Sequence, residues 1–449
     1  MQHPRARWNL PGTAALAAAL ALCPLPLLAQ SPAPAPDAPP PVPAAPAPSA
    51  PPTDEPTFPS LPEPAGQTPA AGEAPRHRPK PKPKPAEPRE AALSDDPTPV
   101  LQPETFYTTA KASERYSAIV DAGGWPTVGV PLHPGSKGPA VSALRRRLAA
   151  EDDALTGTGS SWTPELTEAV KRFQFRMGLR QTGVVAGATL HALDIPATTR
   201  FRQLASSAQR LAGVQFPFGS RYVVVNIPST AVDAVDNDRV VHRYTAIVGD
   251  VEHHSPEVSA KIVAVNINPT WTVPESIIKN EIGPKMQRDP GYLKRARIKV
   301  LNGRGEEIDP RRVNWTSDKP LNYILRQDSG AGNSLGSLRI SMPNPYSVYM
   351  HDTPTKNLFA SDYRFLSHGC VRVQGVMDLA TWLLTDAPGQ WDRNTILRKI
   401  AGGQPEEVKL NHPVPVVWVY MTGWASADGM VHFRDDVYGV DEVGGALPR

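Results

Sequence analysis

The chain has 449 residues, which is long enough for two or three domains. Its formal net charge is only +3, so the composition makes no case for a nucleic-acid partner. The 52 prolines far exceed ordinary usage and gather near the N-terminus, which predicts a region there that packs no core.

Residues 1–29 have the pattern of a secretory signal peptide. Arg5 and Arg7 precede an Ala/Leu-rich apolar stretch, and a small residue follows for cleavage. Pro24 and Pro26 shorten that stretch below the roughly 20 residues of a spanning helix, which favours cleavage over an uncleaved anchor. We therefore expect an exported, periplasmic protein without a membrane span after cleavage.

Residues 30–103 have the composition of a Pro-rich disordered linker. Ala/Pro repeats are followed by alternating Lys and Pro at 79–85, which favours extended polyproline II. The segment is either an inert spacer or a basic tether that carries the folded part toward an anionic wall or membrane surface.

Residues 104–219 are predicted to form a helical scaffold. Between about 130 and 195, apolar residues recur at helical spacing in three short stretches separated by turns. The stretch 169–179, Ala-Val-Lys-Arg-Phe-Gln-Phe-Arg-Met-Gly-Leu, resembles part of the small three-helix peptidoglycan-binding domain. This resemblance implies glycan or peptide binding, whereas the apolar positions alone require only a scaffold core.

From residue 220 the helical pattern gives way to short strands, which predicts a β-sandwich or barrel in an α+β protein. The partly helical, basic stretch 276–325 interrupts the strands and is expected to be a lid or a solvated surface excursion. We place the strand-rich domain at 220–405 and expect 406–449 to pack on the scaffold. The expected strands are 222–227, 240–248, 260–268, 338–342 and one from Tyr346 to His351.

Cys370 is the only cysteine outside the N-terminal segment. The other, Cys23, lies in the signal-like stretch, and the bulky Leu22 before it disfavours lipidation. A lone thiol cannot form an internal disulfide, so Cys370 is either a small buried hydrophobe or a reactive group.

The neighbours of Cys370 favour the reactive interpretation. A nearby imidazole can accept the thiol proton and hold the thiolate as an ion pair. His368 is expected on the same face of an extended segment, and His351 at the end of a preceding strand. Gly369 allows close backbone approach and lets N–H groups face a developing oxyanion, and Arg372 can hold a carboxylate. A helix expected directly after Cys370 would add partial positive charge.

The order of His351 and then Ser367-His368-Gly369-Cys370-Val371-Arg372 resembles the signature of the L,D-transpeptidase (YkuD-type) family. The resemblance implies a cysteine acyltransferase that acts on peptidoglycan stem peptides through a thioester, forms 3→3 cross-links, uses no cofactor and is acylated by carbapenems. The segments 268–277 and 414–440 resemble blocks of its scaffold-bearing, YcbB-like members. Cys370, His351, His368 and Gly369 are the catalytic candidates, and the candidates for substrate contact are Ser367, Arg372, Tyr349, Trp271, Asn333 and Arg326.

Other classes of function remain open. An L,D-carboxypeptidase or an enzyme attaching protein to peptidoglycan would use the same nucleophile, and a non-catalytic wall-binding protein would need only the linker and the three-helix module. A zinc amidase is disfavoured, because His253-His254 has no recognised ligand spacing and no metal is expected. The group that orients His351 is also open between the carboxylate of Asp352, which points oppositely along a strand, and a backbone carbonyl.

Overall fold

The computed structural model describes residues 89–152, 155 and 158–441 of the chain. The expected signal segment and all but the last part of the expected linker lie outside the described residues. Within the described residues, no helix is both long and apolar enough to cross a membrane.

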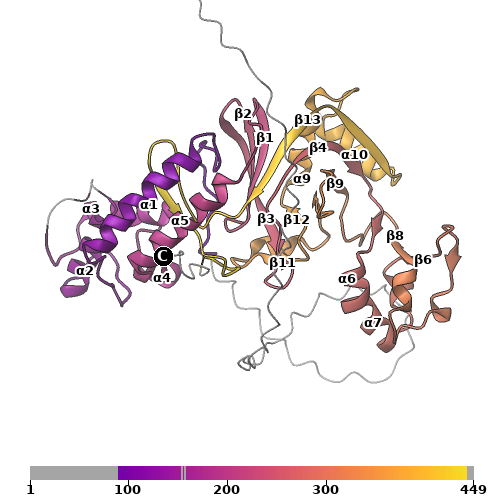
Figure 1. The fold of residues 1–449 in the computed structure, drawn as a ribbon, viewed down its shortest axis with the longest axis horizontal. Coiled ribbons are helices and arrows are strands. Elements are labelled where there is room, and N and C mark those ends of the chain that lie inside the picture. The colour runs from indigo at the N-terminus through magenta and orange to yellow at the C-terminus, as the bar shows by residue number, and fades with distance from the viewer. Residues whose placement is uncertain (1–88, 153–154, 156–157, 442–449) are drawn as a thin grey trace, which may run out of the picture. The chain divides into compact units, whose positions relative to one another are not determined.

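Five helices form the first part of the described chain (Figure 1). Their buried apolar faces share one hydrophobic core, as the helical spacing predicts. The third helix begins where Thr163 caps it, because the side chain of Thr163 accepts a hydrogen bond from the Leu166 N–H and proline follows in the first turn. The five are α1 (Thr105–Asp121), α2 (Pro139–Ala149), α3 (Pro164–Arg176), α4 (Gly187–Asp194) and α5 (Ala197–Ala212).

Nine strands form one mixed sheet that closes on itself. Its order is β11-β3-β12-β10-β9-β4-β13-β1-β2, and β3 also pairs with β2, which makes the closure. The expectation of a sandwich or barrel is therefore confirmed. The strands are β1 (Arg221–Asn226), β2 (Ala231–Asp236), β3 (Arg239–Gly249), β4 (Val258–Ile267), β9 (Leu338–Ser341), β10 (Met350–His351), β11 (Phe365–Ser367), β12 (Val371–Val373) and β13 (Glu406–Val419).

The long strand β13 is a central member of this sheet. It pairs with β1 on one side and β4 on the other, so the boundary expected at 405/406 cuts through the strand-rich unit. The hairpin after β13 does pack on the helices: Ala425 of β14 (Gly423–Ala425) and Phe433 of β15 (Val431–Phe433) are buried in the helical core. The tail expected to pack on the scaffold therefore begins with a strand of the closed sheet, and only its later hairpin lies against the helices.

Two further predictions near the site are wrong in detail. The strand expected from Tyr346 contains only Met350 and His351, because Ser347 has a φ of 56° and breaks the extended run. The helix expected directly after Cys370 is α9 (Val376–Leu383), and β12 intervenes. The α9 N-terminus is thus not the neighbour of Cys370 that a dipole effect requires, since that effect falls off within the first turn. A second helix, α10 (Arg393–Ala401), comes after α9.

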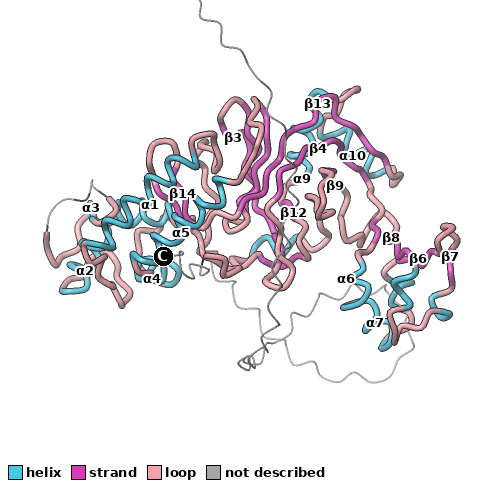
Figure 2. The backbone as a smooth tube through the Cα atoms, in the orientation of Figure 1, coloured by secondary structure: helices cyan, strands magenta, loops and turns pink. Residues whose placement is uncertain are grey.

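The expected insertion is a small folded unit with its own hydrophobic core. Figure 2 shows that it carries strands as well as helices. The strands form a four-stranded sheet in the order β5-β8-β6-β7. Its elements are β5 (Trp271–Thr272), α6 (Glu275–Ile277), the π-helix η1 (Ile278–Ile282), α7 (Gly283–Arg288), α8 (Tyr292–Arg295), β6 (Ile298–Leu301), β7 (Glu307–Ile308) and β8 (Ile324–Gln327).

Candidate active site

Cys370 ends a tight turn between two strands of the closed sheet. Strand β11 stops at Ser367 and β12 begins at Val371, and Gly369 between them has a φ of 99°. A side chain is strained at that φ, and a Cβ would also lie 3.3 Å from the carbonyl oxygen of His254. The buried Ser367 hydroxyl donates a 2.5 Å hydrogen bond to the Cys370 carbonyl, so this side chain holds the turn.

His351 lies on β10, the parallel neighbour of β12, and Cys370 directly precedes β12. Its Nδ1 lies 2.5 Å from the backbone carbonyl of Asp352. A carbonyl oxygen only accepts, so Nδ1 carries the proton and Nε2 carries the lone pair of a base. The Asp352 carboxylate is engaged elsewhere, by the N–H and hydroxyl of Ser337 and by Lys356. The backbone carbonyl therefore orients the imidazole.

Tyr349 connects the thiol to the imidazole. Its ring meets the ring of His351 edge-on at 5.7 Å between centroids. Its backbone and hydroxyl both make polar contact with Cys370, and the hydroxyl also interacts with the side chain of Trp271 on β5. Two of the expected substrate contacts, Tyr349 and Trp271, thus lie at the site.

Burial decides the protonation of the two central groups. It raises the pKa of the Cys370 thiol to about 11, although Tyr349 and the charges of Arg372 and Arg339 act to lower it. Burial, followed by the charge of Arg372, lowers the pKa of His351 to about 3. The resting pair is therefore a neutral thiol and a neutral imidazole. Both shifts act against the thiolate–imidazolium ion pair that the sequence argument expects, because burial disfavours the charged form of each group.

Two arginines flank His351 across three neighbouring strands. Arg372 on β12 and Arg339 on β9 both stand opposite His351 in register, so all three side chains share one face of the sheet. Arg339 also lies over the Tyr349 ring, with 5.3 Å between its guanidinium carbon and the ring centroid. The sequence argument missed Arg339, whose only signal is its place in the strand expected at 338–342.

The side chain of His368 contacts the insertion. Its Nε2 lies 2.9 Å from a carboxylate oxygen of Glu281, on the π-helix η1. Its ring also lies 4.5 Å from that of His253. The expectation that His368 and Cys370 share a face assumed an extended segment, and the turn at Gly369 removes that premise. Glu281 was missed because it lies far from His368 along the chain, in a stretch with no motif of its own.

The two remaining substrate candidates have different surroundings. Asn333 is buried, and its amide group donates to the carbonyls of Pro269 and Asp328 and accepts from the Leu335 N–H. That side chain organises a loop. Arg326 is exposed on β8 of the insertion.

No group of three or more His, Cys, Asp or Glu side chains suited to a metal occurs in the described part of the chain. A cavity of about 330 Å³ lies elsewhere, lined by the segment around Ala91–Val100, the helical part and the tail around Trp424–Val437. Neither Cys370 nor His351 lines it, so the candidate active site rests on its side-chain geometry.

Comparison with known proteins gives matches to both parts of the chain. Residues 220–397 match the family described as "L,D-transpeptidase catalytic domain" (YkuD), and residues 137–193 match "Putative peptidoglycan binding domain". A curated protein of Haemophilus influenzae, "Putative L,D-transpeptidase", is 33% identical over 242 residues. That match covers 54% of this chain and 48% of the relative, so it spans about half of the relative's length.

Solved structures also match, at low similarity. The L,D-transpeptidase of Xylanimonas cellulosilytica is 18% identical, with a TM-score of 0.21 over 65% of this chain and 99% of that one. The L,D-transpeptidase of Stackebrandtia nassauensis is 14% identical, with a TM-score of 0.25 over 65% of this chain and 96% of that one. The matches thus show that residues 220–397 are similar to the YkuD-type L,D-transpeptidase catalytic domain and that residues 137–193 are similar to a peptidoglycan-binding domain.

Proposed function

We propose that this protein is a periplasmic cysteine L,D-transpeptidase that joins peptidoglycan stem peptides by 3→3 cross-links. The observation that carries the proposal is the partly exposed Cys370 beside Tyr349, with the oriented base His351 on the adjacent strand. A structural cysteine needs neither an oriented base nor a turn in which a side chain at position 369 would be strained.

In the first half-reaction, the Cys370 sulfur adds to the carbonyl carbon of the donor stem while its proton passes to Nε2 of His351. The carbonyl π pair moves to oxygen, and backbone N–H groups at the turn face that oxyanion. When the pair returns, the bond to the terminal D-Ala nitrogen breaks, and the His351 proton leaves on that amine. The product is a thioester, and the neutral resting pair makes His351 a general base during attack.

In the second half-reaction, a side-chain amine of an acceptor stem adds to the thioester carbonyl and gives its proton to His351. The carbon–sulfur bond then breaks, and the thiol is restored by that proton. Water in place of the amine would give only trimming, so the outcome depends on excluding water. We propose that the insertion 276–325 is the lid that does this, supported by the Glu281–His368 contact. Arg372, and Arg339 beside it, are proposed to hold a stem carboxylate.

The same nucleophile would serve an L,D-carboxypeptidase or an enzyme that attaches protein to the wall. Incubation of the full chain with purified disaccharide-tetrapeptides, followed by mass spectrometry, separates these functions. A cross-linker yields dimers that have lost one D-Ala, and a carboxypeptidase yields tripeptides alone. Cys370→Ala is the matched negative control, and a chelator tests for a zinc amidase, whose activity it would abolish.

A non-catalytic wall-binding protein is the remaining alternative. Mass detection of a covalent carbapenem adduct on Cys370 would contradict it, since the adduct requires nucleophilic attack by the thiol. The wild type is expected to form the adduct and Cys370→Ala is not. Absence of both the adduct and any change in the stem peptides would reject the enzymatic proposal.

A further inference from the structure

A loop and the C-terminal tail hold the peptide group that precedes Cys370. The Ser255 hydroxyl donates a 2.8 Å hydrogen bond to the carbonyl of Gly369 and accepts one of 2.9 Å from the N–H of Gly249. The Gly249 N–H occupies one acceptor site of the Ser255 hydroxyl. The single proton of that hydroxyl is therefore directed to the Gly369 carbonyl. Ser255 is only 4% exposed, so water does not compete for these bonds.

The loop that carries Ser255 is itself held by Tyr438. The Ser255 N–H donates to the Tyr438 hydroxyl at 3.1 Å, and that hydroxyl donates to the Gly249 carbonyl at 2.7 Å. The Tyr438 ring stacks on His254, with 3.8 Å between ring centroids and 8° between planes. Gly249 has no room for a side chain, because a Cβ would lie 2.1 Å from the carbonyl oxygen of His253. The loop therefore lies directly on the backbone of Gly249.

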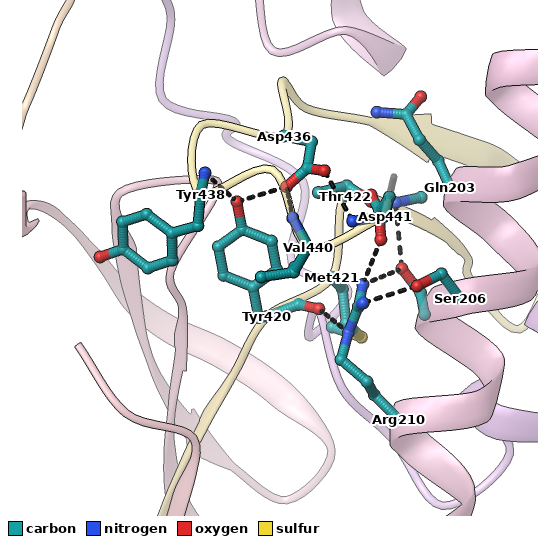
Figure 3. A network of polar contacts seen from close by, with 12 residues as sticks. Gln203, Ser206, Arg210, Tyr420, Met421, Thr422, Asp436, Tyr438, Val440 and Asp441 are labelled. Carbon is teal, nitrogen blue, oxygen red and sulfur yellow. Dashed lines mark hydrogen bonds and ion pairs between the residues drawn. The ribbon is translucent and has the colours of Figure 1, made fainter. Parts of the chain in front are cut away.

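Tyr438 is fixed in turn by the network in Figure 3. Its N–H donates to the Tyr420 hydroxyl at 2.9 Å, and that hydroxyl donates to Asp436 at 2.8 Å. Arg210 of helix α5 donates to the Tyr420 carbonyl and forms a 2.8 Å ion pair with Asp441. The tail is thus anchored to both the helical part and the loop beside the thiol.

The consequence for Cys370 comes from the planarity of the peptide group. In a trans peptide the carbonyl of Gly369 and the N–H of Cys370 point in opposite directions. Holding the carbonyl toward Ser255 therefore directs the Cys370 N–H away from that loop. In the described part of the chain this N–H donates to no acceptor. A free N–H on the nucleophile itself is well suited to meet the oxygen of a carbonyl under attack.

We propose that Ser255 is a positioning residue that orients the Gly369–Cys370 peptide so that the Cys370 N–H stabilises the oxyanion, and that Tyr438 of the tail holds Ser255 in place. This inference deepens the proposed acyl transfer and rests on it for its biological meaning. Neither side chain contacts the reacting atoms. Their effect is on the carbonyl addition step and not on the nucleophilicity of sulfur.

Two reagents separate these effects. Iodoacetamide alkylates the sulfur by displacing iodide, with no oxyanion. With p-nitrophenyl acetate, the sulfur–carbon bond forms as the thiol proton passes to Nε2 of His351 and the carbonyl π pair moves to oxygen. Return of that pair expels p-nitrophenolate and leaves an acetyl thioester. Both rates are measured at one pH on the full chain and followed at Cys370 by peptide mass mapping, because Cys23 is a second thiol. Cys370→Ala gives the background.

Ser255→Ala is expected to lower the ratio of the acylation rate to the alkylation rate about tenfold, which is less than the loss of a whole oxyanion donor. Tyr438→Phe keeps the stacked ring and is expected to lower the ratio about threefold, as for one lost hydrogen bond. The matched control is Tyr363→Phe, at a tyrosine that is 50% exposed, and it is expected to leave the ratio unchanged.

The proposal is overturned if the ratio is unchanged in a folded Ser255→Ala protein, or if the two rates fall together. If Ser255→Ala does not fold, the ratio in Tyr438→Phe decides in the same way. The stem-peptide assay reports on the proposed function separately. If the wild type makes no muropeptide product but the ratio falls in Ser255→Ala, the proposed function is rejected and this inference stands. If the wild type forms cross-links but the ratio is unchanged in Ser255→Ala, this inference is rejected and the proposed function stands.

Discussion

Glu281 accepts a hydrogen bond from Nε2 of His368 at 2.9 Å, which ties the insertion to the residue two positions before Cys370. Lys285 lies 3.0 Å from the same carboxylate. Burial opposes the charge on Glu281, but the hydrogen bonds from His368 and Lys285 prevail and lower its pKa to about 2. The contact therefore joins a charged carboxylate of the proposed lid to the nucleophile turn over the neutral pH range.

Replacing Glu281 is expected to favour hydrolysis over transfer. Glu281→Gln keeps the shape of the side chain but weakens its contact with His368 by about 1 kcal/mol. This corresponds to about a fivefold change in the equilibrium between open and closed lid. We expect the ratio of trimmed tripeptide to cross-linked dimer to rise by about that factor, as measured by mass spectrometry of muropeptides. Glu275→Gln, at an exposed carboxylate that begins helix α6 next to the insertion, is the control. An unchanged ratio would contradict the role of this contact in closing the lid.

The same contact has a pH dependence with a definite sign. The folded pKa of Glu281 is below its ordinary value of 4.5, so its contribution to stability is complete above about pH 4.5. That contribution is lost as the pH falls toward about 2. The difference in Tm between wild type and Glu281→Gln should therefore shrink as the pH falls through this window. A difference that stays constant from pH 6 to pH 2 would contradict the assignment.

Alkylation of Cys370 by iodoacetamide should be slow at neutral pH and rise with alkali. Because burial raises the thiol pKa to about 11, the rate should increase about tenfold per pH unit between pH 7 and 10. Arg372→Gln removes a charge that lowers this pKa, so its profile should move to higher pH. A rate that is already level at pH 7 would show a stable thiolate and contradict the neutral resting pair.

Replacing the proposed base His351 should slow the acylation of Cys370. His351→Ala is expected to slow acylation by a carbapenem about 10²- to 10⁴-fold, the usual range for a general base. Since the His351 pKa is lowered to about 3, the wild-type rate should show no acid limb between pH 5 and 7. An acid limb near pH 6.5 that disappears in His351→Ala would contradict the burial effect on this imidazole.

Gly369→Ala should abolish activity to a degree that its loss of stability does not explain. Gly369 and Gly429 both have positive φ, at 99° and 83°, but only Gly369 has a close neighbour, the His254 carbonyl. Gly429→Ala is therefore the matched control for backbone strain. Both variants are expected to lose about 1–3 kcal/mol of unfolding free energy. Only Gly369→Ala should lose carbapenem acylation, and equal acylation by the two would place the turn outside the site.

The sequence by itself determined the local features of this protein. Helical spacing located α2, α3 and α4, strand patterns located β1, β3, β4 and β9, and the order of His351 and Cys370 gave the candidates for base and nucleophile. These are properties of short stretches, in which period and turn residues specify the local backbone. The parallel pairing of β10 with β12 places His351 on the strand next to the one that follows Cys370.

Only the tertiary structure decided the contacts and the charge states. Ser255 reaches Gly369, and Glu281 reaches His368, across long separations in the chain that no local pattern encodes. The place of β13 at the centre of the sheet depends on partners from both ends of the domain. The protonation of Cys370 depends on how far it is desolvated, and desolvation is a property of the packed structure and not of the sequence around it.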